Sequence, residues 1–280
     1  MIPVLVKDIF PNAALQKYVR KYQVFRFVFD KNIIPPFKRH YPRPEHCITF
    51  YIKDVQKFQY RSPDIIRSYP NCVINGMHTT PVYRYGGNDF LAIKIILRPS
   101  VLHKLLKFPI YELTNSFINA EDIWGKEVST VCDCLKELDK LSGMVTIVEN
   151  FVESQIKKIK TDYQPIDKVS DWLIDEENNV PIGWLANQSC LSTRQFIRKF
   201  EERIGVSAKT FERIIRFDKA YRMKNRHPEY DWLLIAVSCN YHDYQHMVKD
   251  FKEFSNLTPC SLYELELDAP ERSFGFSYLT

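Results

Sequence analysis

The sequence lacks the features that mark membrane-spanning, secreted or zinc-binding proteins. No apolar run approaches the roughly 18 residues that a membrane-spanning helix needs, because the longest candidate, residues 90–97, is interrupted by Lys94. The start Met1-Ile2-Pro3-Val4 lacks the basic residues and long apolar stretch of a secretory signal, so a cytoplasmic protein is expected. The seven cysteines contain no C-x-x-C pair, which excludes a zinc finger and predicts buried, reduced thiols.

Motifs of common catalytic sites are also missing. The chain has only 8 glycines, and it contains no glycine-rich phosphate loop, no G-x-S-x-G elbow and no H-E-x-x-H helix. His40, Glu45 and His46 lie close together before a predicted strand, but the spacing His40-x5-His46 fits no strong metal pattern, and exposed loop histidines are expected. The sequence therefore predicts no catalytic residue, no metal ligand and no cofactor.

The first part of the chain has the pattern of a β-rich domain. With 45% hydrophobic and 14% aromatic residues, the 280-residue chain is expected to form two densely packed domains. Residues 24–29, 47–52 and 91–97 are short, β-branched and aromatic, and turn sequences such as Pro35-Pro36 and Gly86-Gly87 separate them. This spacing predicts a sandwich or small barrel, preceded by a short helix near residues 13–21.

The apolar spacing becomes helical between residues 123 and 160. Ser142-Gly143 is expected to divide this stretch into two helices of an antiparallel hairpin. The apolar surplus from Val128 to Ile159 predicts that the hairpin forms a homodimer contact. A polar stretch ending at Pro165 is the predicted boundary, which gives an α+β protein with a β-rich domain over 1–160 and an all-helical domain over 166–266.

The C-terminal part contains a helix-turn-helix pattern. Ser192 and Gln195 form a capping box that starts a helix running to about Arg203, and Gly205 stands where a C-cap glycine belongs. A small residue in the preceding helix and two apolar anchors are expected to allow close crossing: Ala186, Phe196 and Phe200.

The outer face of this second helix is predicted to contact DNA. Arg194, Ile197 and Arg198 fall on one stripe that points away from the apolar anchors. Arginine suits a bidentate contact with guanine, and isoleucine can meet a thymine methyl group. Thr193 and Lys199 flank the stripe and suit phosphate contacts.

The same pattern recurs about fifty residues later, with Asp243 as the N-cap and Met247 and Phe251 as inner anchors. The outward residues predicted to contact DNA are Tyr244, Gln245, Val248 and Lys249. Ser207 starts a long helix to about Arg226 between the two units. Two units on a stiff spacer can contact successive major-groove segments of one duplex, about one helical turn apart.

Positive charge is concentrated in the same region. Between Ser192 and Lys252 there are 13 Lys+Arg and 8 Asp+Glu, and 13 − 8 = +5 equals the formal net charge of the whole chain. Such a local surplus is the electrostatic footprint of a phosphate-binding surface.

About 100 residues of this region resemble the AraC/XylS family of bacterial transcription regulators. The resemblance is in Leu185-Ala186, Ser192-x3-Phe196-x3-Phe200, Gly205-x-Ser207, Arg216-x3-Ala220, Ile235-Ala236, Asp243-x3-Met247-x3-Phe251 and Thr258-Pro259. It implies a domain of seven helices that binds double-stranded DNA through the two helices described. The sequence departs from the family pattern at Asn240 and Asn256, where glycine is usual, and at Met247, where an aromatic residue is usual.

The N-terminal part is similar to the sensor domains of many such regulators. The similar stretches are Gly76…Tyr85-Gly86-Gly87, Ile95-x-Leu97-x-Pro99 and Pro109-x3-Leu113-Thr114. The similarity implies a cupin-like β-fold that senses a small-molecule effector and a hairpin used for dimerisation. For a transcription regulator, RNA polymerase is expected as a further partner. No effector-binding residue is assigned by it.

The sequence is also compatible with two other hypotheses. One is an interaction protein with degenerate DNA binding, which the departures at Asn240 and Met247 suggest. The other is an enzyme fused to a DNA-binding tail, as in DNA-repair methyltransferases with a zinc-held cysteine. That chemistry needs four clustered cysteines, and only Cys47 and Cys72 precede Cys132.

Overall fold

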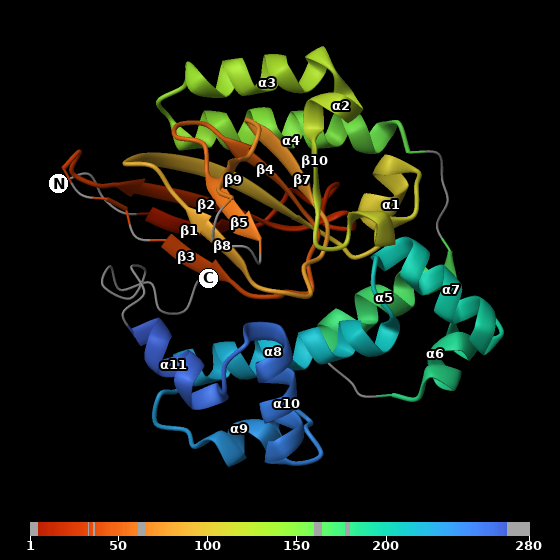
Figure 1. Ribbon diagram of the computed structural model, residues 1–280. Coiled ribbons are helices and arrows are strands. Elements are labelled where there is room, and N and C mark those ends of the chain that lie inside the picture. Colours follow the sequence, from red (N-terminus) through yellow and green to blue (C-terminus); the bar gives the residue numbers. More distant parts are fainter. Residues whose placement is uncertain are drawn as a thin grey trace.

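The computed structural model describes residues 5–32, 34–35, 37–60, 65–159, 164–176 and 180–267 (Figure 1). Strands dominate the N-terminal part and helices form the C-terminal part. The predicted α+β class is confirmed. None of the helices in the described ranges is both long and apolar enough to cross a bilayer.

The strands form two antiparallel sheets. The six-stranded sheet has the order β1 (Leu5–Ile9), β2 (Val19–Val28), β9 (Asp89–Leu97), β4 (Cys47–Tyr51), β7 (Cys72–Asn75) and β10 (Phe117–Asn119). The four-stranded sheet has the order β3 (Phe37–His40), β8 (Val82–Tyr85), β5 (Lys57–Tyr60) and β6 (Arg67–Ser68). The predicted strands at 24–29, 47–52 and 91–97 correspond to β2, β4 and β9, and they are confirmed.

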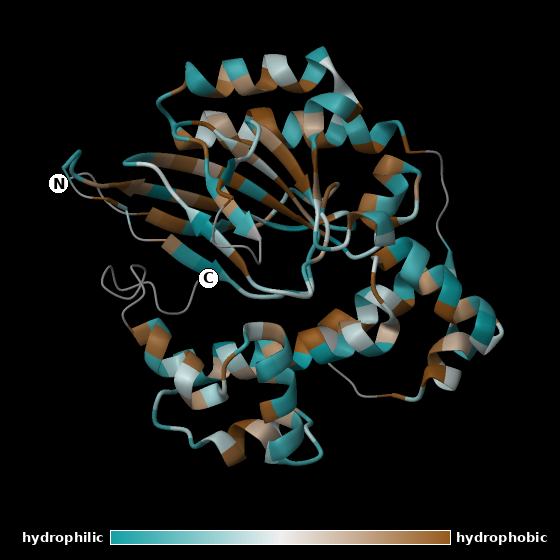
Figure 2. Ribbon diagram, viewed as in Figure 1, coloured by the Kyte–Doolittle hydropathy of each residue, from teal (hydrophilic) through white to brown (hydrophobic). Residues whose placement is uncertain are grey.

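Side chains alternate between the two faces of the six-stranded sheet, as the pleat of a strand requires. Tyr22 pairs with Ile95 and Val24 pairs with Ile93, and these side chains are buried in the core that the sheet shares with the helices. Intervening residues such as Phe25 and Lys94 line a cavity on the opposite face. Hydrophobic residues dominate these central strands (Figure 2).

Five helical segments complete the described N-terminal part: α1 (Val101–Leu106), the 3-10 helix η1 (Ile110–Leu113), α2 (Ala120–Trp124), α3 (Lys126–Lys136) and α4 (Leu141–Lys157). Helix α4 covers one face of the six-stranded sheet, and α3 lies outside it (Figure 1). The hairpin is confirmed, but its break falls between Lys136 and Leu141. The predicted break at Ser142-Gly143 is wrong because Lys140 is the extended N-cap and Gly143 lies in the first turn of α4.

The apolar residues of the hairpin are used within one molecule. Val128 on α3, and Val148 and Phe151 on α4, pack into the core beneath the helices. Phe151 meets Phe50 of the sheet edge-on, with ring centroids 5.7 Å apart. The surplus that suggested a dimer contact is therefore covered by the chain's own sheet, and dimerisation stays a prediction without that support.

The short helix predicted at 13–21 is wrong. Residues 13–18 form turns, in which the Asn12 side chain accepts hydrogen bonds from the backbone N–H groups of Ala14 (3.0 Å) and Leu15 (3.3 Å). Strand β2 already begins at Val19, which pairs with Leu97. Pairing with strands on both sides outweighs the helical spacing of this short segment.

Seven helices form the described C-terminal part: α5 (Pro165–Glu176), α6 (Ile182–Gln188), α7 (Thr193–Ile204), α8 (Ala208–Arg226), α9 (Trp232–Ser238), α10 (Tyr244–Ser255) and α11 (Pro259–Leu267). Their core is aromatic, and the rings of Phe217 on α8 and Phe251 on α10 meet edge-on with centroids 4.8 Å apart. This core is separate from that of the sheets except for Tyr41 and Met77, which enter it from the N-terminal part. Tyr41 donates a hydrogen bond of 3.0 Å to Glu266 of α11.

The cysteine prediction is only partly right. All seven thiols are free, and Cys134, Cys190 and Cys260 are exposed. Cys132 is buried although Cys134 is exposed, because residues two positions apart on a helix point to different faces.

Candidate nucleic-acid interface

The first helix-turn-helix unit has the predicted caps. Ser192 Oγ accepts from Gln195 N at 3.3 Å, and the Gln195 side chain accepts from Ser192 N at 3.1 Å, which completes the capping box. Cys190 takes the left-handed conformation in the turn, with φ 54°. Gly205 ends α7 at φ 92°, where its N–H donates to Glu201 O at 2.8 Å.

Helix α7 has a buried face and an exposed face. Phe196 and Phe200 are fully buried, with ring centroids 5.5 Å apart. Thr193, Arg194 and Arg198 are exposed, and Ile197 is 41% exposed although it is a large hydrophobic residue. The predicted stripe therefore faces solvent, with no apolar neighbour covering it.

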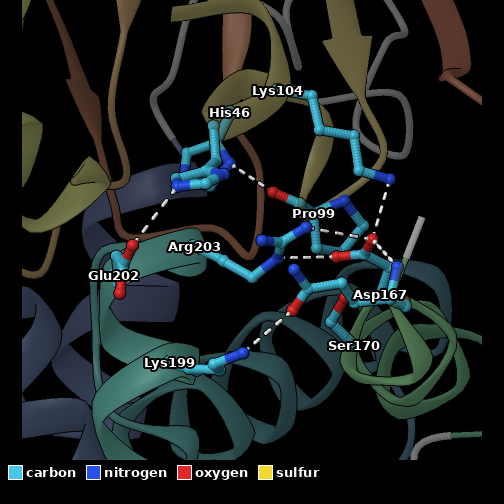
Figure 3. A network of polar contacts seen from close by, with 10 residues as sticks. His46, Pro99, Lys104, Asp167, Ser170, Lys199, Glu202 and Arg203 are labelled. Carbon is cyan, nitrogen blue, oxygen red and sulfur yellow. Dashed lines mark hydrogen bonds and ion pairs between the residues drawn. The ribbon is translucent and has the colours of Figure 1, made fainter. Parts of the chain in front are cut away.

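Lys199 differs from the rest of the predicted set. It is half-buried, and its Nζ lies 3.3 Å from Gln164 Oε1, just before α5 (Figure 3). In this arrangement the ammonium group contacts the protein itself. A phosphate contact by Lys199 therefore requires its side chain to turn away from Gln164, and its role stays a prediction.

The second unit accommodates its departures from the family pattern. Asn240 has φ 57° in the turn and Asn256 has φ 63° at the end of α10, and asparagine tolerates this left-handed conformation better than most residues. Asp243 caps α10 by accepting from His246 N at 2.8 Å, and this backbone hydrogen bond lowers the pKa of its carboxyl group. Asp231, which the sequence analysis missed, caps α9 through Leu234 N at 2.7 Å.

The outer face of α10 is less exposed than that of α7. Met247 and Phe251 are fully buried anchors, as predicted. Gln245 and Lys249 are exposed, whereas the other two predicted contacts, Tyr244 and Val248, are half-buried. The exposed surface of the second unit is thus narrower than the sequence pattern indicates.

Helix α8 joins the two units and holds α10 through an ion-pair cluster. Arg213 on α8 forms an ion pair of 2.8 Å with Asp250 and a second one with Glu253. Its guanidinium group also lies over the Phe254 ring, 5.1 Å from the centroid. These contacts fix the second recognition helix relative to the spacer, and nothing in the local sequence pattern identified them.

The start of the first unit is tied to the N-terminal part through one buried carboxylate. Asp167 on α5 accepts from Arg203 Nε of α7 at 2.9 Å and pairs with Lys104 Nζ of α1 at 2.9 Å (Figure 3). Burial opposes the charged form, but hydrogen bonds from Arg203, Gln164 N and Lys104 together lower the pKa of this carboxyl group. The cluster joins three helices from both parts of the chain.

The end of α7 is enclosed as well. His46 is fully buried, with Nδ1 3.0 Å from Pro99 O and Nε2 3.0 Å from Ile204 O, and burial lowers its pKa to about 4. Thr114 Oγ1 donates to Gly205 O at 2.6 Å. The expectation of an exposed loop is wrong for His46, because the helical domain covers it. His40, in β3, is half-buried.

Basic residues do not gather only on the recognition helices. Of the 13 Lys and Arg residues between Ser192 and Lys252, seven belong to α8. Arg203 is paired with Asp167, and Arg222 is paired with Asp218 at 2.8 Å. The predicted electrostatic footprint is therefore shared between the recognition helices and the spacer.

A separate cavity lies between the two sheets. It has a volume of about 130 Å³, and four of its aromatic lining residues are Phe25, Phe27, Tyr51 and Phe90. Five basic side chains also line it: Lys38, His40, Arg43, Arg84 and Lys94. His40 Nδ1 is buried without a hydrogen-bond partner among the described residues, and burial, followed by the charges of Arg84 and Lys94, lowers the pKa of His40.

No group of three or more His, Cys, Asp or Glu side chains in the described part of the chain is arranged to hold a metal ion.

Residues 185–262, which span both helix-turn-helix units, match a family model described as a helix-turn-helix domain. This region is an AraC-type DNA-binding domain.

Three solved structures are among those similar to the chain. ToxT from Vibrio cholerae O395 is 15% identical over 91% of this chain and 99% of its own, with a TM-score of 0.47. The DNA-binding domain of AdpA, solved with a target DNA, is 17% identical over 39% of this chain and 99% of its own, with a TM-score of 0.36. The AraC-like activator CuxR is 9% identical over 78% of this chain and 88% of its own, with a TM-score of 0.26. No curated protein matches the chain.

Proposed function

We propose that the protein is a sequence-specific transcription regulator that binds double-stranded DNA through both units of its AraC-type domain. The main support is that each recognition helix has fully buried anchors on one face and solvent-exposed polar residues on the other. We assign base contacts to Arg194, Ile197 and Arg198 of α7, and to Tyr244, Gln245, Val248 and Lys249 of α10. Phosphate contacts are assigned to Thr193 and Lys199.

Selection of bound sequences from a random DNA library tests this function. A regulator of this kind enriches one motif with two parts about one helical turn apart, because each recognition helix contacts its own major-groove segment. Recovery of unenriched DNA at every salt concentration would contradict the proposal. That result would favour an interaction protein with degenerate DNA binding. Against this alternative, Asn240 and Asn256 keep the left-handed conformation at the positions where glycine is usual in the family.

We further propose that a small effector binds in the cavity between the sheets. Its aromatic wall suits an apolar body, and the charged side chains of Lys38 and Arg84 favour a negatively charged group. ToxT has been crystallised with an unsaturated fatty acid and with a naphthalenyl butenoic acid. For this chain we infer the same broad chemistry from its own lining residues.

Thermal melting with octanoate, benzoate and their neutral amides tests the effector site. The carboxylates are expected to raise the melting temperature, because a ligand that binds only the folded state stabilises it. The amides are expected to have a much smaller effect, and Arg84→Gln is expected to remove most of the carboxylate effect. Equal shifts from acids and amides would contradict the assigned chemistry.

Four further expectations complete the proposed function. We place the regulator in the cytoplasm with the DNA it binds, and we expect no enzymatic activity. A homodimer and a contact with RNA polymerase are also expected. Sedimentation equilibrium with and without operator DNA tests the homodimer, and a strict monomer in both conditions would contradict it.

A further inference from the structure

A second hollow lies between the sheets and the spacer helix, and we name it the basic cleft. Its volume is about 420 Å³. Arg20 and Lys21 of β2 line one wall, and Lys219, Arg222 and Arg226 of α8 line the other. The cleft therefore brings basic side chains from both parts of the chain toward one space.

The lining of the basic cleft contains more basic than acidic residues. Glu45 and Asp218 are the two acidic lining residues, so the lining carries 5 − 2 = +3 formal charges with His227 neutral. Glu45 forms an ion pair with Lys94, and Asp218 pairs with Arg222 at 2.8 Å. Lys21 pairs with Asp8, which lies outside the lining. Arg43 adds a further positive group 3.9 Å from Asp218. Positive charges on the two walls repel each other, and an anion between the walls reduces this repulsion.

The remaining lining residues are compatible with a ligand larger than a simple ion. Ile96, Ile174, Ile215 and Met223 form apolar patches beside the basic side chains. A volume of this size falls within the range of roughly 300–1,000 Å³ that is typical of small-molecule sites. Guanidinium groups bind phosphate oxygens through paired N–H donors, which favours phosphate over singly charged anions.

We propose that the basic cleft binds a small organic phosphate of about nucleotide size, which carries two or more negative charges. Its phosphate groups lie between Arg20 and Lys21 on one side and the basic face of α8 on the other. Its uncharged part rests against Ile96, Ile215 and Met223. The site is separate from the cavity between the sheets. The ion pair of Glu45 and Lys94 lies between the two hollows, since Glu45 lines the cleft and Lys94 lines the cavity.

Such a ligand is expected to affect how the two helix-turn-helix units are arranged. Because α8 connects the two helix-turn-helix units and contacts both α9 and α10, a bound phosphate that holds α8 against β2 stabilises this arrangement of the units. DNA binding and phosphate binding are then coupled. The phosphate strengthens DNA binding if the DNA-bound form keeps this arrangement, and weakens it if the DNA-bound form does not.

Isothermal titration of the full-length protein with pyrophosphate and with AMP, at constant ionic strength, tests the site. We expect saturable binding of each probe at one site. The double variant Lys219→Gln/Arg226→Gln is expected to weaken pyrophosphate binding at least tenfold, and Arg20→Gln on the opposite wall several-fold. The matched control is Arg194→Gln/Arg198→Gln, which removes two basic residues from α7 and is expected to change pyrophosphate affinity less than twofold.

Three results would overturn the proposal. The first is the absence of saturable binding of either probe by wild-type protein. The second is a loss of affinity in the α7 double variant that equals the loss in the α8 double variant, since the anion would then occupy the DNA-binding surface. The third is binding of citrate as tight as that of pyrophosphate, which would remove the assignment to phosphate. Circular dichroism confirms folding of each variant, and the assay contains no DNA, so its outcome is independent of the proposed DNA binding.

Discussion

Asp167 and Arg203 lie 2.9 Å apart (Oδ1 to Nε) in a setting where both side chains are almost completely buried. Arg203 belongs to the first recognition helix, and Lys104, the second cation on Asp167, belongs to α1 of the N-terminal part. The position of the first recognition helix therefore depends on a contact with the β-rich half of the chain. This relationship gives the N-terminal part a physical means of influencing DNA binding.

Removal of the negative charge of Asp167 is expected to lower the free energy of unfolding. Asp167→Asn removes the negative charge that Arg203 and Lys104 share, and loss of one partner of a buried pair costs about 3–5 kcal/mol. Urea unfolding of the full chain measures the free energy of unfolding. The matched control is Glu127→Gln, which breaks the exposed pair with Lys158 and is expected to cost about 1 kcal/mol or less. Similar losses in both variants would contradict the assigned importance of Asp167.

Two glycines in the helical C-terminal part are expected to respond in opposite ways to replacement by alanine. Gly205 has φ 92°, and an added Cβ would lie 3.1 Å from Ile110 O and from Thr114 Oγ1. Gly205→Ala is therefore expected to lower the free energy of unfolding by at least about 1–2 kcal/mol. Gly183 lies in α6 with open space around the new Cβ, so Gly183→Ala is expected to stabilise by about 0.5–1 kcal/mol. Thermal and urea unfolding measure both, and a neutral Gly205→Ala would contradict the described packing.

Glu212 is expected to make stability depend on pH. Burial raises the pKa of its carboxyl group from 4.5 to about 7, against the opposing charge of Arg216. The folded state then holds a proton that the unfolded state releases, so this group lowers stability progressively as pH rises from about 4.5 to 7. Glu212→Gln removes this dependence, and its advantage over wild type is expected to grow across that range in urea unfolding. A constant difference between pH 5 and pH 8 would contradict the raised pKa.

Arg198 is expected to contribute to the specificity of DNA binding. Arg198→Ala is predicted to weaken binding to the selected site by about 1–3 kcal/mol, the usual value of one good base contact. Fluorescence anisotropy with the selected site and with random DNA measures the two affinities separately. The control is Lys136→Ala. Lys136 is an exposed residue of α3, distant in sequence from the recognition helices. An unchanged ratio between selected and random DNA would remove Arg198 from the base-contacting set.

The AraC-type domain was largely predictable because its determinants are local. The Ser192–Gln195 capping box, the C-cap at Gly205 and the alternation of buried and exposed residues on α7 all follow from residues within a few positions of each other. The strands at β2, β4 and β9 were found for the same reason. The segment 13–21 was misassigned because its conformation depends on pairing between Val19 and Leu97, which are distant in sequence.

The contacts between the two parts of the chain could not be predicted. His46 meets Ile204 across 158 positions, and Asp167 meets Lys104 and Arg203 from two different helices. No spacing rule connects such residues, since their proximity is a product of the packed structure. The distribution of positive charge also depends on the folded structure, because seven of the 13 basic residues between Ser192 and Lys252 lie on the spacer α8.

The central claim is that α7 and α10 contact neighbouring major-groove segments of one duplex. Hydroxyl-radical footprinting on the selected site, with wild type, Arg198→Ala and Gln245→Ala, tests it most directly. We expect two protected segments on one face of the DNA, about 10 base pairs apart, with Arg198→Ala weakening protection in one segment and Gln245→Ala in the other. A single protected segment, or two variants that weaken the same one, would contradict the account.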